Sequence, residues 1–436
     1  MPRSMLDLSL ACLALLGIGS PIASGISASQ SATHDEAYPS FKDYCDMYKL
    51  SYSGSELQKR KALYNEALDE IKAQNAKSSK SWSAKVNRFM TLTSEEMKGL
   101  FGLSKVSSSS SKMSVSPHVA SSSEPPSNKD WRTTLPSVVT AVKDQGHCGS
   151  CWAFAATAAL ESAVAIATGT LWNLSPQQIT SCAPNPNKCG GTGGCSGATA
   201  QIAFNYVRRV GIASEWAYSY SSYYGDSGTC KDSADIIAVA GVEAFRQVQP
   251  NLARELIYAV LENPVAVSVA ASNWRFYSSG IFGYDDCDLI VNHLTVLMGY
   301  GETDGGMSYW LLRNSWGPTW GENGYIRLER AGSGEEEQCG WDTNPQAGSA
   351  CSEPLDGSEP ATKVWVCGTC GVLSDSSYPI RAFLGAPLGP RDPALDNTSL
   401  ISAHKHNLRG FSEGTDGAAF LQVPTTSGGH RQGPEL

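Results

Sequence analysis

Residues 145–154 read Q-G-H-C-G-S-C-W-A-F, and this stretch decides how the rest of the chain is interpreted. The Ala-rich residues after it predict a helix from Cys151 to about Thr168. Cys151 would then stand at a helix N-terminus, where unpaired backbone N–H groups and the helix dipole favour a thiolate. Because the thiolate is the attacking form of cysteine, Cys151 is a candidate nucleophile.

Two motifs further along the chain supply partners for such a nucleophile. His293 lies in V-N-H-L-T-V, and Asn314 lies in L-L-R-N-S-W-G. The histidine can serve as a base that the asparagine orients. Gln145, six residues before Cys151, carries an amide N–H₂ group able to stabilise an oxyanion. The combination predicts a cysteine peptidase.

Other interpretations of the cysteine motif stay open at this stage. Cys151 could be an inert core residue, or Cys148 and Cys151 could form a redox C-x-x-C pair. The redox interpretation requires a preceding parallel strand and gives the His and Asn motifs no role. His147 is the only other histidine between this motif and Pro379, and it is a local neighbour of Cys148. His293 is therefore the better base.

The motifs resemble those of the papain family, in particular its cathepsin L-like branch. The matching residues are Gln145, Gly149, Ser150, Cys151, Trp152, His293, Asn314, Ser315, Trp316, Gly317 and the run C-G-V-L-S-D-S-S-Y-P at residues 370–379. The resemblance implies that Cys151 is the nucleophile, His293 the general base and then acid, and Asn314 the orienting residue. It also implies an oxyanion hole made by Gln145 and the Cys151 N–H. No cofactor or metal is implied.

The resemblance implies an α+β fold of two lobes with the cleft between them. Helices are expected in the lobe that bears Cys151, and strands in a barrel-like lobe that bears His293 and Asn314. The expected helices are Pro176–Cys182, with a capping box at Ser175 and Gln178, residues 198–210 and residues 251–262. The expected strands are residues 265–270, 293–300, 309–313 and Tyr325–Glu329.

Substrate-binding residues also follow from the resemblance. They are Gly149, Gly197, Ala198, Thr199, Ser268, Asn292, Leu294, Trp316 and Asp375. Asp375 falls at the base of the pocket for the second residue before the scissile bond, where a carboxylate could pair with Arg. The walls would be Thr199, Ala200, Ser268, Val291 and Leu294, and the upper part should accept Leu or Phe. In the alternative, Asp375 turns to solvent or bonds a backbone N–H.

The same positions leave a second function open. Ala198 and Leu294 stand where the family has Gly and a small residue. A catalytically weak papain-like protein that acts as a protein-binding module is therefore the alternative to the endopeptidase. The expected partners of the enzyme are protein or peptide substrates and its own propeptide, and a monomer is expected. A net charge of −9 gives no basic footprint for nucleic acid.

The N-terminal part predicts an exported precursor. Residues 1–24 resemble a signal peptide, with Arg3 before the apolar residues 8–18 and small residues at 23–25. Asp7 is unusual there and leaves a retained membrane anchor open. We therefore expect the secretory pathway, ending in a lysosome or vacuole or outside the cell.

Residues 25–125 are predicted to be an inhibitory propeptide with a Ser-rich linker. A helical stripe at residues 56–75 resembles the ERFNIN signature of papain-family propeptides, and Asn87, Phe89 and residues 92–97 resemble the second motif. Lys85 and Thr91 replace the usual Gly and Asp of that motif. Loss of the Asp puts acid-triggered loosening in doubt, so we expect cleavage in the linker at residues 104–127, near 124–126.

The remainder divides into a peptidase domain, residues 126–380, and a disordered tail, residues 381–436. The domain carries an insertion at about 332–366, expected on the strand-rich side. Asn397 and Asn173 are glycan acceptors, the second weakened by Pro176.

Thirteen cysteines in an exported chain imply disulfides. The family pattern pairs Cys148 with Cys195, Cys182 with Cys230 and Cys287 with Cys370. It leaves Cys189, Cys339, Cys351 and Cys367 unassigned, and a zinc site that uses the C-x₂-C of Cys367 and Cys370 remains a rival.

Overall fold

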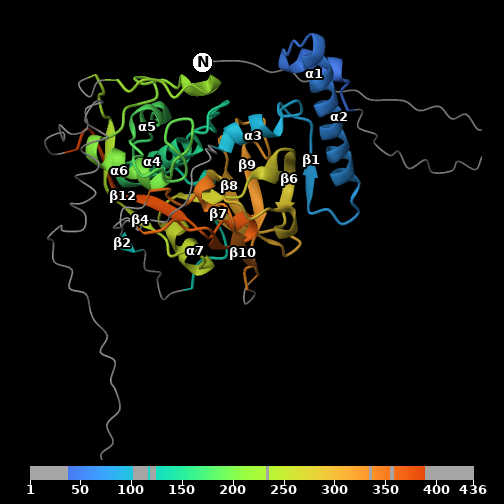
Figure 1. The fold of residues 1–436 in the computed structure, drawn as a ribbon. Coiled ribbons are helices and arrows are strands. Elements are labelled where there is room, and N and C mark those ends of the chain that lie inside the picture. Colours follow the sequence, from blue (N-terminus) through green and yellow to red (C-terminus); the bar gives the residue numbers. More distant parts are fainter. Residues whose placement is uncertain are drawn as a thin grey trace, which may run out of the picture. The chain divides into compact units, whose positions relative to one another are not determined.

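The computed structural model describes residues 38–101, 116–117, 124–231, 235–332, 336–353 and 358–387 (Figure 1). The chain divides into the units Met1–Ser40 and Phe41–Leu436, and the account below concerns the second. The expected signal peptide, most of the Ser-rich linker and Asn397 lie outside the described residues.

The helices agree with the local sequence signals. They are α1 Phe41–Tyr48, α2 Gly54–Ala76, α3 Ser94–Phe101, α4 Cys151–Thr168, α5 Pro176–Cys182, α6 Ala200–Val210 and α7 Ala253–Glu262. The predicted bounds of α4 and α5 are confirmed, and Ser175 caps α5 by accepting the N–H of Gln178. Helix α6 begins two residues later than expected because Thr199 is extended. Helix α7 begins after Asn251, which has a positive φ.

Helix α4 is the central helix of the peptidase part. It packs on strands of the sheet and also on α5 and α6 (Figure 1). Its length and composition would allow it to cross a membrane, but most of its residues are buried inside the protein. Burial on nearly all sides explains why its Ala-rich sequence lacks a polar face.

Most strands form one mixed sheet of ten, in the order β1-β6-β9-β8-β7-β5-β12-β4-β2, with β3 paired to β7. The strands are β1 Trp82–Ala84, β2 Ser116–Pro117, β3 Lys129–Asp130, β4 Ala240–Gln247, β5 Val265–Val269, β6 Tyr277–Phe282, β7 His293–Glu302, β8 Ser308–Arg313, β9 Tyr325–Glu329 and β12 Ser376–Leu384. A separate pair contains β10 Cys339–Asp342 and β11 Val364–Cys367. We call the part around α4, α5 and α6 the helical lobe, and the sheet with its connections the strand-rich lobe.

The predicted propeptide is built into this architecture. Its strand β1 extends the sheet by pairing antiparallel with β6. The stripe predicted on α2 is buried, as Tyr64, Ala67 and Ile71 are each at most 1% exposed. The ring of Tyr64 packs 5.0 Å from that of Tyr44 on α1, so the stripe forms the core of the propeptide.

The expectation of a disordered tail from residue 381 onward is wrong at its start. Residues 381–384 continue β12 and pair with β4, where Phe383 lies opposite Gly241 and Leu384 opposite Ala240. Arg381 also forms an ion pair with Glu243 at 2.7 Å. The peptidase part therefore extends beyond the expected end at residue 380, because β4, which the sequence analysis missed, needs a partner strand.

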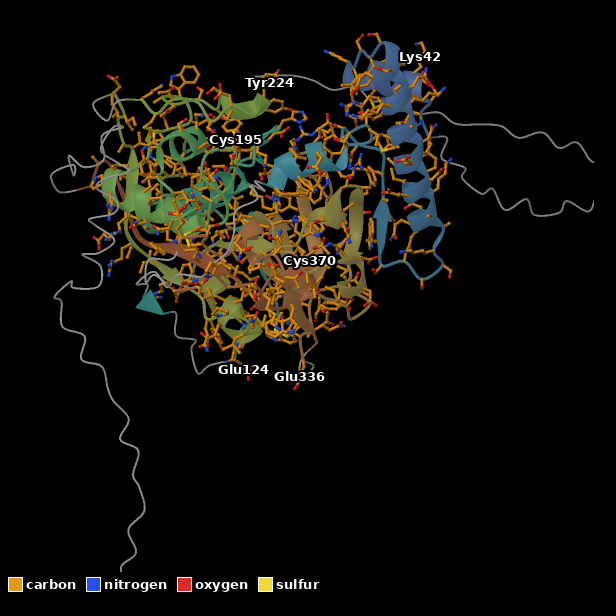
Figure 2. All side chains as sticks on the ribbon, viewed as in Figure 1. Lys42, Glu124, Cys195, Tyr224, Glu336 and Cys370 are labelled. Carbon is orange, nitrogen blue, oxygen red and sulfur yellow. A yellow bond between two sulfur atoms is a disulfide. The ribbon has the colours of Figure 1, made fainter. Side chains whose placement is uncertain are left out.

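The described residues contain five disulfides. Three are the pairs named above: Cys148–Cys195, Cys182–Cys230 and Cys287–Cys370. The others are Cys189–Cys351 and Cys339–Cys367. Figure 2 labels Cys195 in the helical lobe and Cys370 in the strand-rich lobe.

These pairings bear on three earlier interpretations. Cys148 is not bonded to Cys151, which leaves the redox C-x-x-C interpretation without its disulfide. The cysteines of the zinc alternative are all consumed by disulfides. The insertion is not confined to the strand-rich side, since Cys351 is bonded to Cys189 of the helical lobe.

Candidate active site

Cys151 is the first residue of α4 and is 2% exposed. The backbone amides of Leu294, Trp152 and Cys151 itself act to lower the pKa of its thiol. Leu294 is the second residue of β7 and directly follows His293. The start of α4 and the start of β7 therefore bring the candidate nucleophile and the candidate base together.

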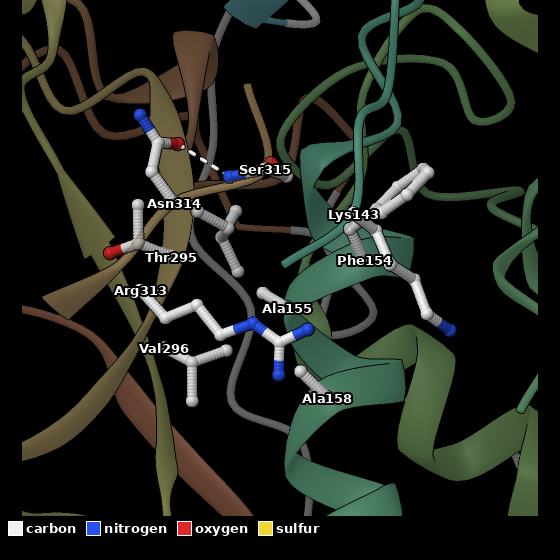
Figure 3. Close-up of a pocket in the computed structure, with 10 residues that line it drawn as sticks. Lys143, Phe154, Ala155, Ala158, Thr295, Val296, Arg313, Asn314 and Ser315 are labelled. Atoms are coloured by element: carbon white, nitrogen blue, oxygen red, sulfur yellow. Dashed lines mark hydrogen bonds between the residues drawn. The ribbon is translucent and has the colours of Figure 1, made fainter. Parts of the chain in front are cut away.

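The hydrogen bonds of Asn314 fix the tautomer of His293. Asn314 Oδ1 accepts the backbone N–H of Ser315 at 2.8 Å, so this atom is the oxygen of the amide (Figure 3). The same oxygen lies 2.8 Å from His293 Nε2, which must therefore carry a proton and donate it. The other ring nitrogen, Nδ1, is buried and has no partner among the described residues. Nδ1 is thus the atom able to accept a proton from the thiol.

Trp316 covers this pair. Its ring lies 5.0 Å from the His293 ring at an interplanar angle of 33°. Trp316 is only 1% exposed, so it keeps water from the hydrogen bond between His293 and Asn314.

Gln145 is fully buried, and its amide is oriented by Ser315, to which the sequence motif had given no role. Ser315 Oγ donates to Gln145 Oε1 at 2.6 Å. The Nε2 group therefore points the other way and donates to the carbonyl of Leu100 at 2.8 Å and to that of Cys148 at 2.7 Å. The N-S-W motif contained the signal for Ser315, because it directly follows Asn314.

The propeptide occupies the catalytic centre through the end of α3. Besides the Leu100 carbonyl on Gln145, the Phe101 carbonyl lies 4.0 Å from Cys151 Sγ. The Phe101 ring stands edge-on to His293 at 5.8 Å. These two residues lie beyond the second propeptide motif, whose predicted end is Met97. A main-chain carbonyl of the propeptide thus takes the place that a substrate carbonyl would need.

Burial changes the protonation of the pair. It raises the pKa of the Cys151 thiol to about 11 and lowers the pKa of His293 to about 4. Both groups are therefore neutral near pH 7 in this precursor. The thiolate expected at a helix N-terminus is not favoured in this state because desolvation outweighs the backbone N–H groups around the sulfur.

An ion pair also binds the propeptide beside the same site. The Arg88 guanidinium forms two bonds with Asp144, the one between Nη2 and Oδ1 at 2.7 Å, and also contacts the Tyr223 hydroxyl at 3.0 Å. Asp144 directly precedes Gln145. This ion pair between distant parts of the chain was not predicted from sequence.

Asp375 is held by polar side chains, which differs from the alternative expectation of solvent or a backbone N–H. Its carboxylate accepts bonds from Gln201 Nε2 at 2.7 Å and from Ser268 Oγ at 2.8 Å. It is half-buried, and burial raises its pKa. The side chain therefore neither turns to solvent nor bonds a backbone N–H. Ser268 was an expected wall residue, whereas Gln201 was missed.

The remaining expected substrate residues lie on both lobes. Gly149 donates to the Cys195 carbonyl at 3.0 Å, Gly197 has φ 83°, and Thr199 directly precedes α6. The Asn292 side-chain amide accepts the Ala271 N–H and donates to Ser272 Oγ, so this side chain is not available to a substrate.

Leu294 also lines a small cavity of about 10 Å³ between α4 and the strands β7 and β8 (Figure 3). From the helix, the cavity wall includes Phe154, Ala155 and Ala158. Its size corresponds to about one water molecule, so it does not form a ligand site.

Comparison with known proteins agrees with this geometry. Residues 125–349 match the model of the papain family cysteine protease, and residues 41–97 match the cathepsin propeptide inhibitor domain. Vignain of Phaseolus vulgaris is 35% identical over 324 residues, which cover 70% of this chain and 86% of vignain.

Solved precursors are similar as well. The recombinant stem bromelain precursor has a TM-score of 0.61 and 30% identity, covering 78% of this chain and 97% of the precursor. The digestive procathepsin L 3 of the Tenebrio molitor larval midgut has a TM-score of 0.59 and 29% identity, with coverage of 78% and 97%. With a buried Cys–His–Asn arrangement and a propeptide carbonyl against it, the chain belongs to the papain family of cysteine peptidases and carries an inhibitory propeptide of the cathepsin type.

Proposed function

We propose that the chain is the precursor of a secretory-pathway peptidase that hydrolyses peptide bonds through a Cys151 thiolate and an acyl-enzyme. The observation that carries this proposal is the hydrogen bond from Gln145 to the carbonyl of Leu100. A peptide carbonyl on that donor, with Cys151 and His293 beside it, has the arrangement that attack on a substrate requires.

In the proposed reaction, Cys151 gives its proton to His293 Nδ1, and the thiolate attacks the carbonyl carbon of the scissile bond. Gln145 Nε2 and the Cys151 N–H donate to the oxyanion that forms. His293 then passes the proton to the amine that leaves, and the acyl group stays on sulfur as a thioester. Water deprotonated by His293 hydrolyses the thioester and restores the thiol.

The proposed domain organisation gives an order of processing. A signal peptide at residues 1–24 would be removed first, and the propeptide would then hold the site closed until the linker before Asp130 is cut. Removal of Phe101 would let water reach Cys151 and His293, which favours their ionised forms. Five disulfides fit an oxidising compartment, and exposed Asn173 is available for a glycan.

Thiol labelling tests the proposed function directly. After propeptide removal, an epoxide-type thiol inhibitor should label Cys151 in proportion to the activity that is lost. The precursor should be labelled much more slowly, because Phe101 covers the sulfur. The measurement should use a Cys45→Ser background, since Cys45 is the other free cysteine of the described residues. An enzyme freed of its propeptide that remains unlabelled would favour the protein-binding module.

The propeptide should remain bound at the mild acidity of a vacuole or lysosome. Hydrogen bonds from Arg60, at 2.6 Å, lower the pKa of Glu96 from its ordinary value of 4.5 to about 2. A carboxylate whose pKa is lower in the folded state stabilises the fold fully at any pH above its pKa in the unfolded chain. This stabilisation is lost as pH falls through the folded-state pKa of about 2. Thr91, where the family has Asp, adds no carboxylate. Hydrogen exchange of α3 in full-length Cys151→Ala protein should therefore show similar protection at neutral and mildly acid pH.

A matched pair of variants separates this ion pair from general acid effects. Glu96→Gln should lower the folding stability of the propeptide by about 1–2 kcal/mol. It should also reduce the hydrogen-exchange protection of α3 at both pH values. Glu95→Gln is the control, because Glu95 is 81% exposed and on the same helix. Complete release of the propeptide from the Cys151→Ala protein by mild acid, without any cleavage, would contradict the prediction.

Asp375 should determine whether Arg is accepted as the second residue before the scissile bond. Gln201 and Ser268 hold its carboxylate in one position, which favours pairing with a guanidinium that reaches the base of the pocket. Asp375→Asn should lower kcat/KM for an Arg dipeptide substrate by about tenfold and leave the matched Leu substrate within about threefold. Equal and poor cleavage of the Arg substrate by both enzymes would show that Asp375 does not contact the substrate.

A further inference from the structure

The insertion runs from one lobe to the other. At its first end, Asp342 Oδ2 accepts the N–H of Val291 at 3.2 Å, two residues before His293. At its other end, Cys351 is bonded to Cys189, and Gly190 N–H donates to the Ala350 carbonyl at 2.9 Å. We call the connecting residues 344–352 the strap.

The strap is packed in place. Ala347 and Ala350 are 3% and 4% exposed, and Pro345 is buried. Asp342, itself fully buried, also accepts the N–H of Asn344 at 2.7 Å, which fixes the start of the strap. Beyond Cys351, two further backbone bonds join residues 352 and 353 to residues 188 and 187 of the helical lobe. Both ends are therefore held by buried or covalent contacts, so that the strap cannot swing away like a surface loop.

Gly348 lies where the two lobes face each other. A β-carbon on Gly348 would lie only 2.8 Å from the carbonyl carbon of Val291 and 3.0 Å from Cα of Asn292. On the opposite side, a β-carbon on Gly190 would lie 2.8 Å from the Gly348 oxygen and 3.1 Å from the Ala198 oxygen. The backbone of Gly348 thus packs against Val291 and Asn292 on one side and lies close to Gly190 on the other, which leaves no room for a side chain at either glycine.

The position of Gly348 affects which substrates can bind. Val291 and Ala198 belong to the segments expected to flank the second residue before the scissile bond. Among the described residues, the N–H and C=O of Ala198 make no hydrogen bond, so a substrate residue can still pair with them. An extended peptide advances about 3.3 Å per residue, so its third residue would lie one step beyond the residue paired with Ala198, beside the strap that is bonded to Gly190.

We propose that the strap closes the cleft on the N-terminal side of the scissile bond, so that substrates with at most two residues before that bond are cleaved best. This inference rests on the proposed peptidase function. A longer substrate would have to displace residues 345–350, which expose buried surface when they move and are tied down by Cys189–Cys351. The strap is thus a specificity-determining element that acts by exclusion.

The test is a length series of fluorogenic amides on the activated enzyme. Every substrate carries the same residue before the scissile bond and Leu at the second position, with one, two, three or four residues in all, each with a free or acetylated N-terminus. We expect kcat/KM to rise from one to two residues and to fall at least about tenfold at the third. Cleavage of the three- and four-residue substrates as efficient as that of the two-residue substrate would overturn the proposal.

Two variants attribute the effect to the strap. Cys189→Ser combined with Cys351→Ser removes the covalent tie without leaving an unpaired cysteine. A second variant replaces residues 345–350 with a short Gly-Ser linker in that background. Both variants should cleave the longer substrates with a higher kcat/KM than the wild type does. In the linker variant, kcat/KM for these substrates should come within about threefold of that for the two-residue substrate. Unchanged discrimination in a linker variant that still labels at Cys151 would contradict the assignment to the strap.

Labelling of Cys151 keeps the two hypotheses separate. If the wild-type enzyme is labelled and cleaves substrates of all lengths equally well, only the proposed exclusion by the strap is refuted. Wild-type enzyme that neither labels nor cleaves any substrate refutes the proposed function. Rates are divided by the labelled fraction, so partial misfolding of a variant does not mimic exclusion.

Discussion

Replacing Cys151 with alanine will reduce kcat/KM for peptide hydrolysis by about 10⁵-fold or more, as expected when a covalent nucleophile is lost. No other described cysteine thiol can substitute, because Cys148 is in a disulfide and Cys45 lies in the propeptide. Folding should be preserved, since alanine is a good helix former at the first position of α4.

The measurement is kcat/KM of the activated enzyme with a dipeptide amide, with thermal unfolding of the precursor as the folding control. The matched variant is Cys45→Ala, which makes the same change at the other free cysteine and should leave activity after propeptide removal unchanged. Hydrolysis by Cys151→Ala above about 1% of wild type would be incompatible with a thioester intermediate.

Replacing Gln145 with alanine will lower kcat by about 10² to 10³-fold while KM changes little, because its amide donates to charge that develops only in the transition state. The same change should also weaken binding of the propeptide, because the Leu100 carbonyl accepts a hydrogen bond from this amide. Steady-state kinetics of the mature enzyme and inhibition by the propeptide measure the two effects.

Ser315→Ala provides the graded comparison for Gln145. It removes the 2.6 Å bond that orients the amide but keeps the donor itself. We therefore expect a smaller loss in kcat, about tenfold, with an unchanged pH profile. A loss for Ser315→Ala as large as that for Gln145→Ala would indicate a general disturbance of the site, and no loss for either would remove Gln145 from the oxyanion hole.

Local sequence signals determined much of the frame around the site. Helix α4 was predicted at its true bounds from an Ala-rich run, and α5 from Ser175 and Pro176, because capping and helix propensity act within a few residues. The buried stripe of α2 followed from the helical repeat alone. The strands with continuous apolar character, such as β5 and β7, were also found, whereas β6 was not, because Ser and Gly interrupt its pattern.

The sequence by itself thus determined the catalytic motifs, the main helices and the presence of an inhibitory segment. The tertiary structure alone decided that Leu100 covers Gln145, that Arg88 pairs with Asp144, that Gln201 holds Asp375, and that Cys351 reaches Cys189. Residues 189 and 351 are 162 positions apart, and no local propensity specifies such a contact. It depends on the path of the chain between them, which is set by the sum of many packing interactions over both lobes.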